Sequence, residues 1–170
     1  MDLEISKKDR IILINQYRIL AKLEPNESER LEELIEILEN GYRLFYSMID
    51  EWISDDMPED RSILVLDILG IYRIIEDHKR LVSSQAVMEH SFHFFPGFDG
   101  NNESEYLSFS RFLIEKQGKF TEQKPYLKRN DNLNSHLPMV PKYRKMVNAW
   151  KSMGSAYHLT EQQILSILDA

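Results

Sequence analysis

The strongest hydrophobic pattern in the chain lies in residues 63–75, where ten of thirteen positions are large and apolar. On a helical wheel these positions cover well over half of the circumference. That is more than the roughly 100° stripe of a helix that buries only one face. We therefore predict a central helix here, which continues to about Val82 and has other elements packed on it from several sides.

The segment 7–23 is a second broadly apolar helix. Its apolar positions span about 220° of the wheel, and Asn15, Arg18 and Lys22 form only a narrow polar stripe. Such breadth predicts either an interior helix or a helix whose far side is buried by another subunit.

Shorter helices are predicted on both sides of the central one. Residues 27–40 have an apolar and an acidic face, with Asn26 as a suitable N-cap and Gly41 suited to the left-handed conformation that ends a helix. Thr160 and Gln163 form the capping-box pattern that starts the last helix.

The predicted helices are 7–23, 27–40, 42–53, 61–82, 102–117, 141–153 and 161–168. No segment has the alternation of a strand. We therefore predict an all-α protein, with residues 1–170 forming a single-domain bundle of about six to eight helices around the central apolar helix.

Two segments do not follow a helical period. Residues 83–101 contain Phe92, Phe94, Phe95 and Phe98, which cannot all remain exposed in a stable monomer, so we expect them to close one end of the core. Residues 119–140 are interrupted by prolines and rich in turn-forming residues. They predict a long connection that is the most mobile part of the chain.

Charge is distributed unevenly along the chain, whose net charge is −7. Residues 1–115 contain 12 basic and 24 acidic side chains, whereas residues 116–151 contain 9 basic and 2 acidic ones. Three interpretations remain open: two solvated faces of unlike sign, self-association of an acidic face with the basic segment, and local binding of nucleic acid or another anion.

The absence of cysteine excludes disulfides and every cysteine-ligated metal site. The first residues have no pattern of a targeting signal, and no run reaches about 18 uncharged apolar residues. We expect a cytoplasmic protein that does not associate with membranes.

Asp67 is a candidate functional carboxylate because it stands alone in the apolar central helix. A buried carboxylate needs a hydrogen-bonded cation, and the cations on its own helix lie at the wrong spacing. We expect Arg18 or Arg111, from other helices, as its partner. A structural ion pair or a solvated position explains Asp67 more simply than a catalytic acid does.

Asp99 and Glu103 belong to a second candidate site, which begins like a calcium loop. The residues at positions 6 and 12 of that loop are Ser104 and Ser110, so the calcium pattern fails. Helix capping by Asp99, Asn101 or Asn102, with Glu103 and Glu105 complementing the N-terminal dipole, explains the same residues better. His90 and His93 have a spacing that a metal site can use, but no further ligand pattern accompanies them. We therefore predict no metal and no cofactor.

The candidate anion-binding residues are Lys128, Arg129, Arg144 and Lys145, which lie among aromatic residues in the basic segment. This composition is typical of phosphate contacts and base stacking, and equally of a solvated loop. No catalytic Ser-His-Asp arrangement, phosphate-binding loop or dinucleotide fingerprint is present. An enzymatic interpretation therefore lacks a nucleophile.

Four strings of residues stand out along the chain: Leu23-Glu24-Pro25, Asn40-Gly41-Tyr42, Phe95-Pro96-Gly97-Phe98-Asp99 and Tyr157-His158-Leu159. With others they resemble the YfbU family of small bacterial proteins. The resemblance runs in order along nearly the whole chain, and none of its motifs is catalytic. It implies an all-α cytoplasmic protein that self-associates, with no settled biochemical activity.

Three functional hypotheses follow. The first is a non-enzymatic protein-interaction or regulatory module that forms homo-oligomers through the helix 7–23. The second is a nucleic-acid or anion binder that uses the basic segment 116–151. The third is an enzyme with a carboxylate site near Asp67 or Asp99.

Overall fold

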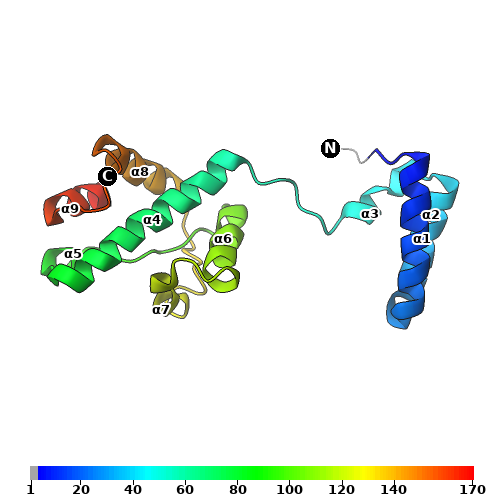
Figure 1. Ribbon diagram of the computed structural model, residues 1–170, viewed down its shortest axis with the longest axis horizontal. Coiled ribbons are helices and arrows are strands. Elements are labelled where there is room, and N and C mark those ends of the chain that lie inside the picture. The colour runs from blue at the N-terminus through cyan, green and yellow to red at the C-terminus, as the bar shows by residue number, and fades with distance from the viewer. Residues whose placement is uncertain (1–3) are drawn as a thin grey trace. The chain divides into compact units, whose positions relative to one another are not determined.

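The computed structural model describes residues 4–170, which contain helices joined by turns and irregular segments, with one isolated bridge between Phe98 and Asn134. Nine α-helices lie within this described part of the chain, two of them only four residues long. The all-α prediction is confirmed. The chain divides after Asp56 into two compact units, which are described separately below (Figure 1). A single domain over residues 1–170 stays a prediction.

The first unit is a helical hairpin. Its helices are α1 (Lys7–Leu23), α2 (Ser28–Asn40) and the short α3 (Ser47–Asp50). α1 and α2 pack side by side (Figure 1). The small core of this unit is made of Ile14, Leu34, Ile37, Leu38, Tyr46 and Ile49.

Local signals define the ends of the two long helices of the hairpin. Ser6 and Asp9 form a capping box that starts α1, and Gly41 ends α2 in the left-handed conformation with φ 69°. The role of Gly41 was predicted correctly, whereas the cap at Asn26 was wrong. Asn26 lies in η1 (Pro25–Glu27), a single 3-10 turn, and α2 begins without a side-chain cap.

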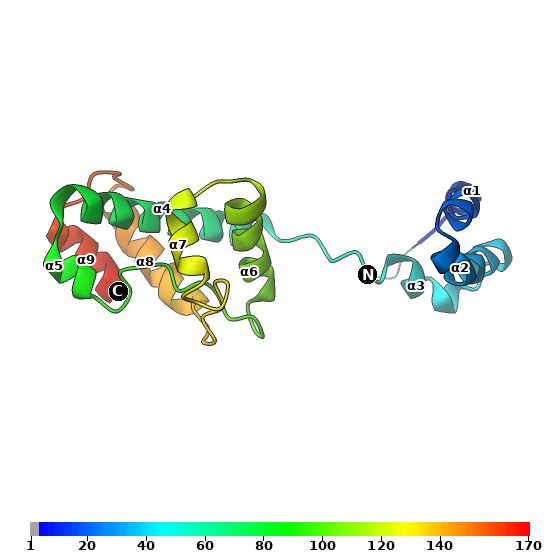
Figure 2. The same cartoon turned by 90° about the horizontal axis from the view of Figure 1, so that it is seen from below.

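The second unit is organised around α4 (Glu59–Val82), which is the predicted central helix. The helices α6 (Ser104–Arg111) and α8 (Val140–Ser152) pack against α4, and α9 (Glu161–Asp169) packs against α8 (Figures 1 and 2). Eight side chains of α4 are buried: Leu64, Val65, Ile68, Leu69, Ile71, Tyr72, Ile74 and Ile75.

The aromatic segment closes this core, as the sequence predicts. Phe95 and Phe98 are fully buried, and the Tyr143 hydroxyl of α8 donates a 2.7 Å hydrogen bond to the Gly97 carbonyl. A Cβ on Gly97 would lie 1.8 Å from the Leu133 carbonyl oxygen, and φ at this residue is 92°. Only glycine fits at this position.

Two predicted elements differ from the structure. The helix expected over 42–53 is replaced by η2 (Arg43–Phe45), another 3-10 turn, and by α3. Only Tyr46 and Ile49 of this stretch are buried in the core, and Met48 packs against it partly buried, which is too little packing to stabilise a long helix.

The connection 119–140 is also more structured than predicted. It contains η4 (Thr121–Gln123), a 3-10 turn, and α7 (Lys124–Leu127). Phe120, Gln123 and Leu133 are buried, so tertiary contacts hold local structure that no sequence period indicates. The shorter helices α5 (Gln85–Glu89) and η3 (Phe112–Lys116), a π-helical turn, complete the unit.

Candidate functional site

The outer face of α1 is the first candidate surface. Ile14 is buried in the core of this unit, whereas the apolar side chains on the other side of the helix are between 42% and 68% exposed. Those side chains are Ile12, Ile19, Leu20 and Leu23. Ile11 is also exposed, but it lies beside Arg18 and Lys22 in the polar stripe of the helix. Because Ile12, Ile19 and Leu23 are spaced by seven and four residues, they form one stripe along the helix. We call Ile12, Ile19, Leu20 and Leu23 the outer face of α1.

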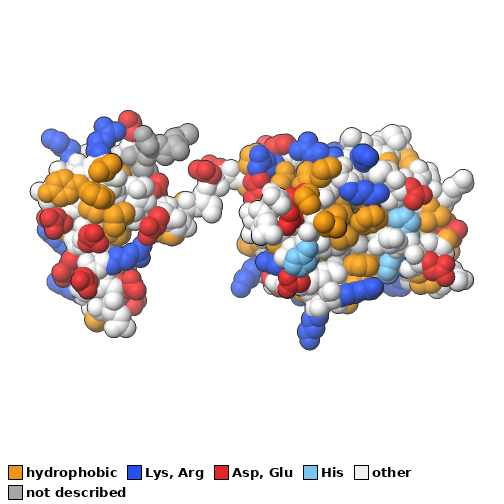
Figure 3. Space-filling view, turned by 180° about the vertical axis from the view of Figure 1, so that it is seen from behind, with side chains coloured by type: hydrophobic (Ala, Val, Ile, Leu, Met, Phe, Trp, Pro, Cys, Tyr) orange, Lys and Arg blue, Asp and Glu red, His pale blue; other side chains and the backbone are white. Residues whose placement is uncertain are grey.

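Six apolar side chains are buried in the core of the first unit over its described residues 4–56, so the outer face of α1 is large in comparison. Contiguous apolar surface of this kind is typical of sites that contact another protein. Figure 3 shows apolar side chains on the surface of both units. The outer face of α1 carries no catalytic chemistry, since its residues are aliphatic.

A groove of about 230 Å³ between α4 and α8 is the second candidate surface. Its α4 wall carries two carboxylates and its α8 wall carries two cations. The lining residues are Asp60, Ile63, Leu64 and Asp67 from α4, and Arg144, Val147, Asn148 and Lys151 from α8.

Asp67 closes one end of this groove. Lys151 Nζ lies 2.7 Å from Asp67 Oδ2, which is an ion-pair distance. The Lys151 ammonium group is not aligned for a hydrogen bond to this oxygen. Within residues 4–170, the buried Asp67 Oδ2 accepts no hydrogen bond. The prediction that the partner comes from another helix is confirmed.

Neither of the two cations expected to pair with Asp67 does so. Arg18 lies in the first unit and pairs with Glu39 of α2 at 2.5 Å. Arg111 Nε donates to the Asn132 carbonyl oxygen at 2.7 Å. Lys151 supplies the charge because α8 packs beside α4.

The expected cap of α6 by Asp99, Asn101 or Asn102 is wrong, since α6 begins without a side-chain cap. Asp99 and Glu103 make other hydrogen bonds within the fold. Both are buried, and Glu103 accepts hydrogen bonds from the backbone N–H groups of Asp99, Met139 and Val140 at 3.1, 2.9 and 2.7 Å. Asp99 accepts from the Asn102 side chain and from the Asn101 backbone N–H. These two bonds, the first being stronger, lower the pKa of Asp99. Both carboxylates are thus engaged in hydrogen bonds within the fold.

The four predicted anion-binding residues are not brought together at one site. Arg144 lines the groove between α4 and α8, whereas Lys128 lines a different hollow beside α7. The guanidinium carbon of Arg129 lies 4.4 Å from the centre of the Phe94 ring, and Lys145 is exposed on α8. The second unit has 14 basic and 14 acidic side chains, so its total charge does not favour a polyanion.

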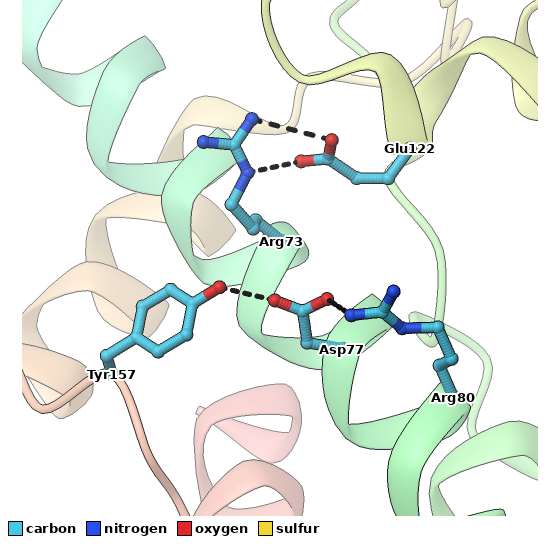
Figure 4. Close-up of polar contacts among 5 residues, drawn as sticks. All are labelled: Arg73, Asp77, Arg80, Glu122 and Tyr157. Atoms are coloured by element: carbon cyan, nitrogen blue, oxygen red, sulfur yellow. Dashed lines mark hydrogen bonds and ion pairs between the residues drawn. The ribbon is translucent and has the colours of Figure 1, made fainter.

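A polar network on α4 was not anticipated from the sequence. Arg73 donates to the carboxylate of Glu122 at 2.7 and 3.4 Å, and the Tyr157 hydroxyl donates to Asp77, which also accepts from Arg80 at 2.8 Å (Figure 4). These contacts attach η4 and the segment before α9 to α4. The sequence signal that could have indicated this network is the recurrence of polar residues every three or four positions along 73–80.

Of the two histidines considered as metal ligands, His90 has other contacts. His90 Nε2 lies 3.1 Å from Asp169 Oδ1, and His90 Nδ1 accepts a hydrogen bond from the Phe92 backbone N–H. In the part of the chain that the structure describes, no three His, Asp or Glu side chains converge as a metal site would require. Over the same residues, no helix combines the length and apolar character of a membrane span.

Comparisons with known proteins give a consistent result over the whole chain. The YfbU domain matches residues 3–170. The chain is 47% identical over 169 residues to the UPF0304 protein MJECS11 of Methanocaldococcus jannaschii, which covers 98% of this chain and 99% of the relative. It is 30% identical over 169 residues to a UPF0304 protein of Histophilus somni, covering 99% of this chain and all of that relative.

Proposed function

The chain belongs to the YfbU family, and from the surface of its first unit we propose that it is a non-enzymatic helical module that forms homo-oligomers through the outer face of α1. The observation that carries this proposal is the exposed stripe of Ile12, Ile19 and Leu23 on a helix whose opposite side is already packed on α2. A second copy of the chain is the partner because the stripe is uninterrupted by charge and can pair with itself.

The polar residues beside the stripe support an ordered contact. Asn15 and Gln16 lie between Ile12 and Ile19 and are exposed. In helix pairs, one polar position within an apolar seam selects register and subunit number at some cost in stability. This proposal places the protein in the cytoplasm, which is compatible with a sequence that has no cysteine.

The non-enzymatic part of the proposal rests on the candidate carboxylates. Asp67 faces Lys151, and Glu103 accepts hydrogen bonds from three backbone N–H groups. A carboxylate in such contacts has little capacity left to act as a general acid or base.

Light scattering of the full chain at low and high salt tests self-association. We expect an oligomer that persists at high salt, because apolar contacts are not screened as ion pairs are. The double variant Ile12→Lys with Ile19→Lys should give a monomer with unchanged helix content by circular dichroism.

A matched control adds the same two charges to exposed helical positions elsewhere. Ser108→Lys with Gln162→Lys, on α6 and α9, should leave the mass of the particle unchanged. A wild-type monomer at high concentration would refute the proposal, as would a double α1 variant that retains the wild-type mass.

A further inference from the structure

The two ends of the groove between α4 and α8 differ in whether their charged side chains form an ion pair. At one end Asp67 and Lys151 are 2.7 Å apart. At the other end, Asp60 and Arg144 both line the groove, and neither forms an ion pair with any residue of the described chain. Asp60 and Asp67 are two helical turns apart on α4, as are Arg144 and Lys151 on α8, so about 10 Å separates the two ends.

Charge of both signs is thus available at the open end. The guanidinium of Arg144 can donate two parallel hydrogen bonds to a carboxylate. Across the groove, the carboxylate of Asp60 can accept hydrogen bonds from an ammonium group. Asn148 lies one turn after Arg144 and offers an amide that forms no hydrogen bond within residues 4–170.

The floor of the groove is apolar. Ile63, Leu64 and Val147 line it between the two charged ends. Convergent polar groups around an apolar floor are the usual features of a small-molecule site, and such sites are commonly about 300–1,000 Å³ for drug-sized ligands. A groove of about 230 Å³ therefore suits a smaller molecule.

We propose that the open end of this groove binds a free α-amino acid with an apolar side chain. Its carboxylate pairs with Arg144, its ammonium group pairs with Asp60, and its side chain lies on Ile63, Leu64 and Val147. A molecule with only one of the two charges leaves either Arg144 or Asp60 unpaired. This site lies entirely in the second unit and does not depend on self-association through α1.

Calorimetric titration of the full chain with three probes tests the proposal. L-Leucine carries both charges, L-leucinamide lacks the carboxylate, and 4-methylpentanoate lacks the ammonium group. We expect L-leucine to bind with a dissociation constant on the order of 1 mM or tighter, which is realistic for so small a ligand. Each single-charge probe should bind at least about tenfold more weakly.

Variants identify the groove as the site. Arg144→Gln and Asp60→Asn should each weaken L-leucine binding at least about tenfold. The matched controls Lys145→Gln and Glu59→Gln change the adjacent exposed residue on the same helix and should leave binding unchanged. Thermal unfolding of each variant confirms that it is folded.

Three results would overturn the proposal. They are no heat of binding up to about 10 mM L-leucine, equal binding of L-leucine and L-leucinamide, and equal weakening by Arg144→Gln and Lys145→Gln. Because the variants of α1 test self-association separately, either proposal can fail while the other stands.

Discussion

The side chain of Glu103, just before α6, caps the N-terminus of α8. Glu103 Oε1 accepts a 2.7 Å hydrogen bond from the backbone N–H of Val140, the first residue of that helix. The other oxygen accepts from Met139, so a carboxylate satisfies two of the N–H groups that a helix start leaves unpaired. One carboxylate thus joins two segments of the fold that are 37 residues apart.

Replacing Glu103 with Gln should lower the free energy of unfolding by about 1–3 kcal/mol. The charge that faces the start of α8 is lost, and the amide NH₂ group meets backbone donors instead of accepting from them. Urea unfolding measures the change. Glu115→Gln, at an exposed position in η3, is the control and should have little effect. Equal stability of the two variants would contradict the capping role.

Gly97→Ala should be more destabilising than Gly154→Ala. Both glycines have positive φ, at 92° and 78°, so both substitutions strain the backbone. Only at Gly97 does the added Cβ meet other atoms, because the Leu133 carbonyl oxygen would be 1.8 Å away. We expect an additional loss of at least about 2 kcal/mol at Gly97, measured by urea unfolding. Similar losses at the two positions would show that Leu133 moves away freely.

Tyr72 and Tyr143 are both fully buried but differ in hydrogen bonding. Burial raises the pKa of both phenols. The Tyr143 hydroxyl donates to Gly97, whereas within residues 4–170 the Tyr72 hydroxyl has no partner. Tyr143→Phe should cost about 1 kcal/mol or more in unfolding experiments, and Tyr72→Phe should be neutral or stabilising. A larger loss at Tyr72 would indicate that its hydroxyl is satisfied.

His93 should make stability depend on pH. Burial, followed by the charges of Lys79, Arg129 and His90, lowers its pKa below the ordinary value of 6.5. Because the folded state binds the proton less readily than the unfolded state, this contribution is fully present above pH 6.5. It is lost as the pH falls through 6.5 toward the lowered pKa.

Urea unfolding at several pH values between 5 and 8 measures this effect. Stability of the wild type should fall toward acidic pH more steeply than that of His93→Gln. The carboxylates near this cluster, Glu76 and Asp169, remain in both proteins, so their titration cancels in the comparison. Parallel curves for the two proteins would exclude His93 as the titrating group.

The sequence by itself determined the elements whose signals are local. α1 occupies the predicted residues 7–23, α4 is the predicted central helix, and Thr160 and Gln163 form the predicted capping box of α9. Helical periodicity and caps act within a few residues, so they can be read from neighbouring positions in the chain. The position of Gly41 in the left-handed conformation is set by the same local physics.

Only the tertiary structure decided which distant side chains meet. Asp67 faces Lys151, although Arg18 and Arg111 were equally good partners by charge. From the sequence, Glu103 is expected to complement the N-terminal dipole of its own helix, yet two of its three backbone donors belong to the start of α8. The short helix α7 forms where no period predicts one. Such pairings depend on how helices pack across the core. The charge and polarity of a side chain indicate which type of partner it requires, but not which element provides that partner.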